Sequence, residues 1–320
     1  MNFRIEKYQP ANRDLWDRTL MRSINGSFLL QRNYMDYHSG RFRDFSLIIY
    51  TGNEPVALLP AHREGNKLYS HRGLTYGGLV LARPLRVPVL RTLWNQVLDF
   101  LARKEISGLF LDEIPLFYYR WHTEALRRTY EHSGQMISSK DFWVIDTARP
   151  KDGLCNADRR RSLRKAAKMN LQTGPSDDWQ GFWDLLQNSL EKRHGAKPVH
   201  SLDEMDLLRR RFPGQILLFT TRRNDELLAG AVLYKNRHVL RFQYLAGRTE
   251  TPLRPAIDAL TWHIIERFYP QVRFIDLGTA LLPDGSPNDT LIYWKQSFGA
   301  CPHAQYSWKF AVQTYEAPGL

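Results

Sequence analysis

The residues best suited to do chemistry lie in one stretch of the second half, positions 237–268. The run His238–Gly247 is rich in aromatic and β-branched residues and ends in glycine, the pattern of a strand. The run Pro255–Phe268 places its apolar residues on one helical face, and Arg248 and Arg254 lie in the loop between. A helix start carries unpaired N–H groups and a partial positive charge, so this unit predicts an anion site. The alternative is an ordinary solvated connection, because few helix starts bind phosphate.

Five further residues could serve acid–base chemistry or bind an acceptor. His194, Lys197 and His200 place two imidazoles and an ammonium in the segment that follows a predicted helix. A loop histidine can titrate near neutral pH and act as a base. Tyr244 lies within the predicted strand, and Asp276 lies near the end of a later one. Their structural alternatives are a solvated helix end for the loop and an aromatic core position for Tyr244.

Other candidates lie further along the chain. His71 and Tyr76 belong to a glycine-rich segment, where a backbone can approach a ligand closely, and we expect them to line a cleft between lobes. Lys295 could contact an anionic donor, or it could cap a helix before Gly299. The basic run 159–168 is either a solvated face or a site for the phosphate tail of a donor.

The spacing of the potential metal ligands and nucleophiles predicts neither a metal site nor a covalent enzyme intermediate. Two cysteines and ten scattered histidines show no ligand spacing, and no nucleophile elbow or phosphate-binding P-loop is present. The simplest mechanism is therefore direct transfer between two bound substrates.

The composition is that of a globular protein with a basic surface. Of 320 residues, 43% are hydrophobic, and 45 Lys and Arg against 33 Asp and Glu leave a net charge of +12. This balance favours an anionic partner such as a nucleotide-bearing cofactor, tRNA or an acidic membrane or polysaccharide surface. The first residues lack the apolar core of a signal peptide, and no apolar run is long enough to span a bilayer. We expect a cytoplasmic protein.

Periodicity divides the chain into two halves with a similar order of elements. Each half has helices, a two-stranded hairpin, a further strand, a helix and closing strands. The segment 149–153 has the composition of a connection. We therefore predict an α/β (α+β) protein with lobes at residues 1–148 and 149–320.

Several segments resemble the GNAT acyltransferases, and in particular the two-lobed GNAT-like proteins related to the Fem-type aminoacyl transferases. The order of hairpin, strand 239–246, loop, helix and strand 274–278 is that of the GNAT core. The more specific segments are Tyr69–Gly78, Arg160–Ala166, Lys192–Ser201 and Trp294–Ala300. The resemblance implies two tandem GNAT-like lobes, each a mixed, mostly antiparallel sheet flanked by helices, in a bacterial protein with a cell-envelope or polysaccharide role.

The resemblance also implies roles for individual residues. In the GNAT arrangement, backbone N–H groups of the strand serve the thioester carbonyl, and the following loop binds the donor. This places Ala246, Gly247, Arg248, Arg254 and Lys295 at an acyl-coenzyme A site. It places Tyr244, His200 and Asp276 at the catalytic centre. His71, Tyr76, His194 and Lys197 would bind the acceptor.

The expected function is N-acyl transfer from acyl-coenzyme A to a small amine such as an amino sugar, without a metal. The usual GNAT pyrophosphate-loop pattern is absent from Gly247–Arg254, and so is the long helical hairpin with which Fem proteins contact tRNA. Two alternatives stay open beside acyl-coenzyme A. One is an aminoacyl-tRNA donor, and the other is a non-catalytic role in polysaccharide assembly.

Overall fold

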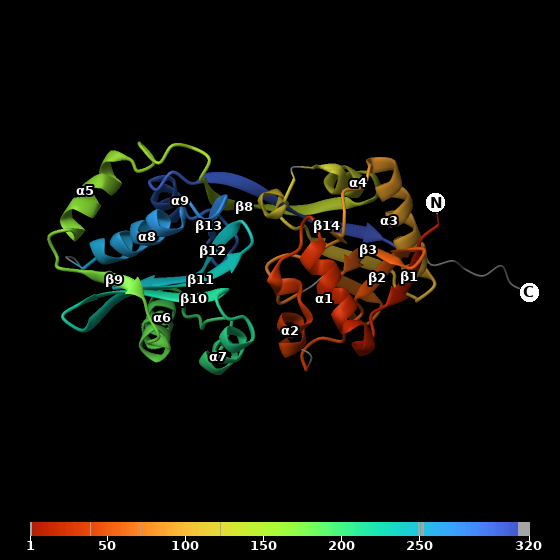
Figure 1. Ribbon diagram of the computed structural model, residues 1–320, viewed down its shortest axis with the longest axis horizontal. Helices are drawn as coiled ribbons and strands as arrows, with labels where there is room; N and C mark the ends of the chain where they lie inside the picture. Colours follow the sequence, from red (N-terminus) through yellow and green to blue (C-terminus); the bar gives the residue numbers. More distant parts are fainter. Residues whose placement is uncertain are drawn as a thin grey trace, which may run out of the picture. The chain divides into compact units, whose positions relative to one another are not determined.

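The computed structural model describes residues 2–38, 40–70, 72–121, 123–248, 250 and 253–312, without the side chains of residues 38, 193 and 194. Contacts divide the chain into unit 1, residues 1–140 and 304–320, and unit 2, residues 141–303. Helices and mixed, mostly antiparallel sheets make up each unit, which confirms the predicted α/β class (Figure 1).

The two units differ from the predicted lobes in where they begin and end. Their boundaries lie inside two strands, β8 (Gln135–Asp146) and β14 (Cys301–Ala311), rather than at residue 148. The later part of β14 pairs antiparallel with β7 (Gly108–Asp112). Because this pairing is with a strand of unit 1, residues 304–312 belong to that unit and not to the second lobe.

Unit 1 contains two sheets, with strand orders β1-β2-β3-β6 and β4-β5-β7-β14. A parallel pair, β5 and β7, is joined through the crossover helix α3. The remaining elements are β1 (Arg4–Lys7), α1 (Arg13–Arg22), α2 (Arg32–Met35), β2 (Leu47–Thr51), β3 (Glu54–Leu59), β4 (His62–Glu64), β5 (Lys67–Ser70), β6 (Val80–Leu81), α3 (Val87–Ala102) and α4 (Ala125–Ser133).

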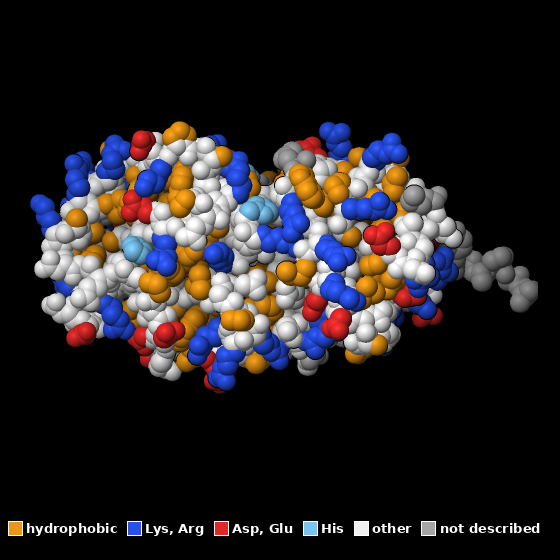
Figure 2. All heavy atoms as spheres, in the orientation of Figure 1, with side chains coloured by type: hydrophobic (Ala, Val, Ile, Leu, Met, Phe, Trp, Pro, Cys, Tyr) orange, Lys and Arg blue, Asp and Glu red, His pale blue; other side chains and the backbone are white. Residues whose placement is uncertain are grey.

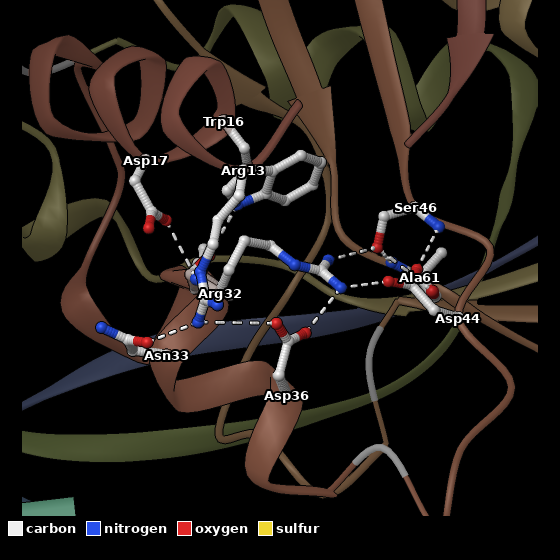
Figure 3. A network of polar contacts seen from close by, with 10 residues as sticks. Arg13, Trp16, Asp17, Arg32, Asn33, Asp36, Asp44, Ser46 and Ala61 are labelled. Carbon is white, nitrogen blue, oxygen red and sulfur yellow. Dashed lines mark hydrogen bonds and ion pairs between the residues drawn. The ribbon is translucent and has the colours of Figure 1, made fainter. Parts of the chain in front are cut away.

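A buried arginine, Arg32, joins helix α2 of unit 1 to the segment that precedes β2 (Figure 3). Arg32 is 3% exposed, and its guanidinium pairs with Asp36 at 2.7 Å and with Asp44. It also lies 3.8 Å from the centre of the Tyr8 ring. Two carboxylates and an aromatic face together compensate for burying the charge. The charge of Arg32 is paired within the fold, so we assign the cluster a structural role.

Unit 2 has one sheet of strand order β8-β13-β12-β11-β10-β9. In Figure 1, α8 and α9 lie on one side of these strands, and α6 and α7 lie on the other. The elements are α5 (Ala157–Ala166), β9 (Gln172–Pro175), α6 (Trp179–His194), α7 (Leu202–Arg211), β10 (Ile216–Arg223), β11 (Glu226–Asn236), β12 (Val239–Gly247), α8 (Pro255–Phe268), β13 (Phe274–Thr279) and α9 (Asp289–Gln296).

Local sequence signals define the connection between α6 and α7. Gly195, with φ of 57°, ends α6 in the left-handed conformation that glycine favours. Ser201 and Glu204 form a capping box at the start of α7. These two signals confine the intervening loop to a few residues and hold His200 in a buried position between the helices.

A close approach of α6 to the sheet depends on a glycine in β11. A Cβ at Gly230 would lie 2.2 Å from Cδ2 of Phe182, a buried residue of α6. Only the absence of a side chain lets the helix pack at this depth. The opposite face is filled by the apolar stripe of α8, whose Leu260, Ile264 and Ile265 are fully buried.

Candidate functional site

Strands β12 and β13 are paired over only three residues and then separate. Their parallel ladder joins Val239–Arg241 to Phe274–Asp276 and ends there. β12 continues beside β11, with a register shift that leaves Gln243 as an extra residue. A bulge of this kind bends its strand and interrupts pairing. Among the described residues, the edge of β12 that faces β13 therefore has no strand partner beyond residue 241.

Backbone donors of β12 point to that open edge. Arg248 N donates to Leu228 O of the β11 side at 2.8 Å. Because successive N–H groups of a strand point to opposite edges, those of Leu245 and Gly247 point away from β11. Ala246 and Gly247 were both predicted to bind the acyl donor. The N–H of Ala246 points toward β11, so only Gly247 presents its N–H to the opening.

Gly247 also lets α8 approach the end of β12. A Cβ at this position would lie 3.3 Å from the Cβ atoms of Ala229 and Ile257. This separation is tighter than ordinary side-chain contacts. The glycine thus brings the start of α8 against the strand whose amides face the opening.

Tyr244 and His200 form a contact on the α6 side of the sheet. Nδ1 of His200 lies 2.6 Å from the Tyr244 hydroxyl, and the Tyr244 ring meets Trp183 edge-on at 5.4 Å. Burial raises the pKa of Tyr244 to about 12, although hydrogen bonds from His200 and Gln243 act in the opposite direction. The phenol is therefore protonated at neutral pH and can act as a proton donor.

A chain of polar contacts continues from Tyr244 to Asp276. Gln243 reaches the Tyr244 hydroxyl and accepts a hydrogen bond from Arg241 Nε at 3.2 Å. Nη1 of Arg241 pairs with Oδ2 of the fully buried Asp276 at 2.7 Å. The three residues predicted to be catalytic, Tyr244, His200 and Asp276, thus lie in one network. Asp276 is its buried anchor, whereas the tyrosine end is half-buried.

Lys295 of α9 lies in the same charged cluster. It is 3% exposed, and Nζ donates to Gly278 O at 2.9 Å and to Thr279 O at 2.5 Å. Burial lowers the pKa of Lys295 to about 7, while Asp276 raises it and Arg241 lowers it further. Lys295 was predicted to contact an anionic donor. Its ammonium instead holds the end of β13, because α9 directs the side chain into the unit.

We expect Lys295→Met to remove a pH dependence of stability. Lysine titrates near 10.5 when unperturbed, so between pH 7 and that value the unfolded chain binds one proton more than the folded chain. Lys295 therefore contributes stability that rises with pH in this window, by up to about 1.4 kcal/mol per unit. Urea unfolding at pH 7.5 and 8.5 should show that the free energy of unfolding rises more with pH for the wild type than for the variant. The exposed Lys192→Met is the control, and parallel curves for wild type and Lys295→Met would contradict the assignment.

A basic groove lies at the start of α8, between this helix and α5. We call it the α5–α8 groove; its volume is about 640 Å³. Arg254 and Pro255 line it, and α8 has no side-chain cap at this end. Five of the lining residues are basic and two are acidic. The basic ones are Arg159, Arg161, Lys165, Lys168 and Arg254.

The buried acid of the α5–α8 groove is already neutralised by the fold. Asp258 pairs with Arg159 and accepts hydrogen bonds from Ser162 Oγ at 2.5 Å and Trp294 Nε1 at 2.8 Å. These contacts fasten α5 and α9 to α8. Arg161 pairs with the exposed carboxylate of Asp158 at 3.6 Å, which leaves Lys165, Lys168 and Arg254 for a ligand. Figure 2 shows Lys and Arg side chains gathered over the end of unit 2 that carries α5.

The second predicted arginine of this loop lies elsewhere. Nη1 of Arg248 pairs with Oε1 of Glu226 at 2.8 Å, and Arg248 is not among the residues that line the groove. The backbone N–H of Arg248 bonds to Leu228 O, so this residue extends the pairing of β12 with β11 by one position. Thr249, Thr251 and Pro252 of this loop lie outside the described residues.

The residues predicted to bind the acceptor do not form a group within one unit. Tyr76 is 2% exposed and its hydroxyl donates to Ser27 Oγ at 2.9 Å, as part of the core of unit 1. His71 lies outside the described residues. His194 is the last residue of α6, with its side chain outside the description, and Lys197 is exposed in the following loop.

Sequence reasoning missed Arg241 and Gln243, which join the tyrosine to the aspartate. Arg241 stands within a strand of otherwise apolar neighbours, and a charge at such a position needs a buried partner. That signal could have suggested Asp276 as the partner. Gln243 carries no comparable signal, because its contacts depend on the bulge.

The described part of the chain contains neither a cluster of metal ligands nor a membrane-spanning helix. No group of three His, Cys, Asp or Glu residues there could hold a metal ion. None of the helices described is long and apolar enough to cross a bilayer.

Residues 157–287 match the family model described as Acetyltransferase (GNAT) domain. No curated protein matches the chain. Among solved structures the chain is similar to FemX, with 11% identity over 96% of this chain and 97% of that one and a TM-score of 0.71. It is also similar to the C-terminal domain of a putative lysylphosphatidylglycerol synthetase from Agrobacterium fabrum, with 12% identity over 93% and 92% and a TM-score of 0.58. A tandem GNAT protein from the clavulanic acid biosynthesis pathway has 13% identity over 98% and 100% and a TM-score of 0.55.

The matched region covers most of unit 2, which is therefore a GNAT-type acyltransferase domain. At these identities, the likeness to solved structures is one of fold. The chain as a whole has the two-lobed GNAT-like fold that FemX and the tandem GNAT protein share, which confirms the predicted resemblance.

Proposed function

We propose that this protein is an N-acyltransferase that moves an acyl group from acyl-coenzyme A to an amine, in a direct reaction between two bound substrates. We further propose an amino sugar or a related cell-envelope precursor as the acceptor. The observation that carries the donor assignment is the α5–α8 groove, whose cations surround the uncapped start of α8 next to the opened strand β12.

The α5–α8 groove suits the phosphates of the donor. A helix start favours negative charge, and arginine and lysine add charge-assisted hydrogen bonds to phosphate oxygens. The groove presents both, with Arg254 at the helix start and Lys165 and Lys168 on the facing wall. Since α8 is the next element after β12, a carrier held here would direct its acyl end toward the open edge of β12.

The open edge of β12 would stabilise the reacting carbonyl. As the amine attacks the thioester, the carbonyl oxygen gains negative charge, and donors aimed at it lower the barrier. The N–H groups of Leu245 and Gly247 point in that direction. Backbone donors of a sheet are held rigidly, so they need no reorganisation during the reaction.

Tyr244 would donate the proton that the leaving sulfur needs. When the carbon–sulfur bond breaks, the thiolate takes the phenolic proton, and the new carbon–nitrogen bond releases one proton from the amine. His200, hydrogen-bonded to the phenol, would return a proton to Tyr244 and take up the one that the amine loses. The products are an amide and the free thiol. Asp276 acts through Arg241 and Gln243 as a positioning residue for Tyr244.

The two arginines of the loop should differ in their effect on donor binding. We expect Arg254→Ala to weaken acetyl-coenzyme A binding about tenfold, because one charge-assisted contact is worth 1.5–3 kcal/mol at most sites. Arg248→Ala is the matched control and should change the affinity less than twofold, since Arg248 pairs with Glu226. Isothermal titration calorimetry measures both. Equal losses in the two variants would place the phosphate outside the α5–α8 groove.

The proposed activity is tested by thiol release. Purified protein is incubated with acetyl-, longer acyl- or no coenzyme A ester and a set of amino sugars, and free thiol is measured. Thiol release that requires both an ester and an amine would support the proposal. If no ester binds in calorimetry and none is cleaved with any amine, the acyl-coenzyme A donor is wrong.

An aminoacyl-tRNA donor is the second candidate. The observation in its favour is that basic residues extend along α5 beyond the groove, to the exposed Arg160 and Arg164. Such a track offers more phosphate contacts than a coenzyme A needs, and its binding would fall steeply with salt. A gel-shift experiment with bulk charged tRNA at low salt separates the two donors, and failure to shift would remove this candidate.

A further inference from the structure

The outer edge of strand β10 is only partly covered. β9 pairs with β10 from Phe219 to Arg222, and the last bond between the two segments runs from Ser176 N to Leu218 O at 3.0 Å. The chain then turns away into α6. Within the part of the chain that the structure describes, the first residues of β10, from Ile216 to Leu218, therefore have a strand partner on the β11 side alone.

Three backbone groups point toward this uncovered edge. Lys235 N donates to Gln215 O at 2.7 Å, so Gln215 and every second residue after it face β11. The N–H and C=O of Ile216 and the N–H of Leu218 face the other way. None of these three groups makes a hydrogen bond to any described residue. Unpaired strand groups of this kind are a template for another strand.

These groups lie in a groove of about 550 Å³ that we call the β10 edge groove. Three cations and a single acid, Asp177, line it, and each cation lies over an aromatic ring. Lys235 and Arg267 have no ion pair among the described residues, whereas Arg209 pairs with Asp206. The stacked pairs are Arg209 over Trp179 at 5.5 Å, Lys235 over Phe268 at 5.7 Å and Arg267 over Phe219 at 5.6 Å.

We propose that the β10 edge groove docks an extended, acidic peptide segment of a partner protein, which adds to the sheet beside β10. The unpaired C=O of Ile216 requires a hydrogen-bond donor, which a peptide N–H supplies and a phosphate or carboxylate does not. The two unpaired N–H groups require acceptors, which the same peptide's carbonyls supply. Acidic side chains on either face of the added strand then meet the cations, since Lys235 and Arg267 flank one face and Arg209 the other.

This surface is separate from the proposed acyl-transfer site. In the strand order β13-β12-β11-β10, the uncovered edge lies on the far side of β10 from the opening between β12 and β13. The docking proposal therefore goes beyond acyl transfer. Each can fail without the other.

The test uses a fluorescein-labelled peptide of five glutamates with an amidated end. Fluorescence anisotropy at low salt should show binding to the full chain, and Lys235→Glu or Arg267→Glu should each weaken it at least tenfold. Lys192→Glu, an exposed lysine of α6, is the matched control and should leave binding within twofold. Hydrogen exchange should show new protection of the amides of Ile216 and Leu218 when the peptide is bound.

A second probe separates strand addition from simple charge attraction. The same peptide with every backbone amide N-methylated keeps its five carboxylates but has no N–H to donate to Ile216 C=O, and it should bind at least tenfold more weakly. Equal binding of the two peptides would overturn the proposal and leave a general polyanion surface. Unchanged binding to Lys235→Glu and Arg267→Glu, with thermal melting showing both variants folded, would overturn it as well.

Discussion

Replacing Tyr244 by phenylalanine should lower kcat for acyl transfer by about 10²- to 10⁴-fold, the range that a general acid contributes. The KM for the acyl donor should stay within twofold, because the substitution keeps the ring and its edge-on contact with Trp183. The reason is the hydroxyl alone: burial raises its pKa to about 12, so the phenol carries the proton that the leaving sulfur requires. Steady-state thiol release with acetyl-coenzyme A and an accepted amine measures both constants.

The control is Tyr293→Phe, which removes a hydroxyl from an exposed tyrosine whose partner is Asp158. This variant should keep the wild-type kcat. His200→Ala removes the hydrogen-bond partner of the Tyr244 hydroxyl and should also lower kcat, since His200 Nδ1 positions the phenol. A Tyr244→Phe enzyme with wild-type kcat would show that the proton comes from elsewhere, although the GNAT assignment of unit 2 would stand.

Replacing Asp276 by alanine should destabilise the protein by about 3–5 kcal/mol, the cost of breaking a buried ion pair from one side. Asp276 is fully buried, and its loss leaves Arg241 without its carboxylate beside the buried Lys295. Gly278 N would also lose the 2.7 Å hydrogen bond that turns the end of β13. Urea unfolding at neutral pH measures the free energy of unfolding of each variant.

Glu226→Ala is the matched control, because Glu226 pairs with Arg248 where both side chains are about 40% exposed. An exposed ion pair is worth at most about 1 kcal/mol. If the two variants lose equal stability, the Arg241–Asp276 pair is not the anchor of the separated strands. A stable Asp276→Ala protein with low kcat would instead indicate that the carboxylate acts on the substrate.

The elements of the fold followed closely from local patterns. The strand within 238–247 was predicted from its aromatic and β-branched residues and the helix that begins at Pro255 from its periodicity, and the structure confirms them as β12 and α8. Their bounds could be read from sequence because each depends on neighbouring residues: a glycine at the strand end and a proline in the first helical turn.

The candidate site depended on contacts that no local pattern describes. His200 and Tyr244 are 44 positions apart, and they meet because α6 ends at Gly195 and the loop turns back over β12. Lys295 was expected at an anionic ligand, yet α9 directs it into the unit. Arg248 and Arg254 look equivalent in the sequence, but only Arg254 lines the α5–α8 groove.

By itself, the sequence determined the α/β class, the basic surface and the strand–loop–helix unit, because these depend on composition and on residues close together in the chain. The tertiary structure alone decided where β12 and β13 separate, which of their amides are open and which charges are buried together. Those features depend on a bulge, on the packing of α9 against β13 and on the desolvation of charges, each of which arises only when distant segments are brought into contact.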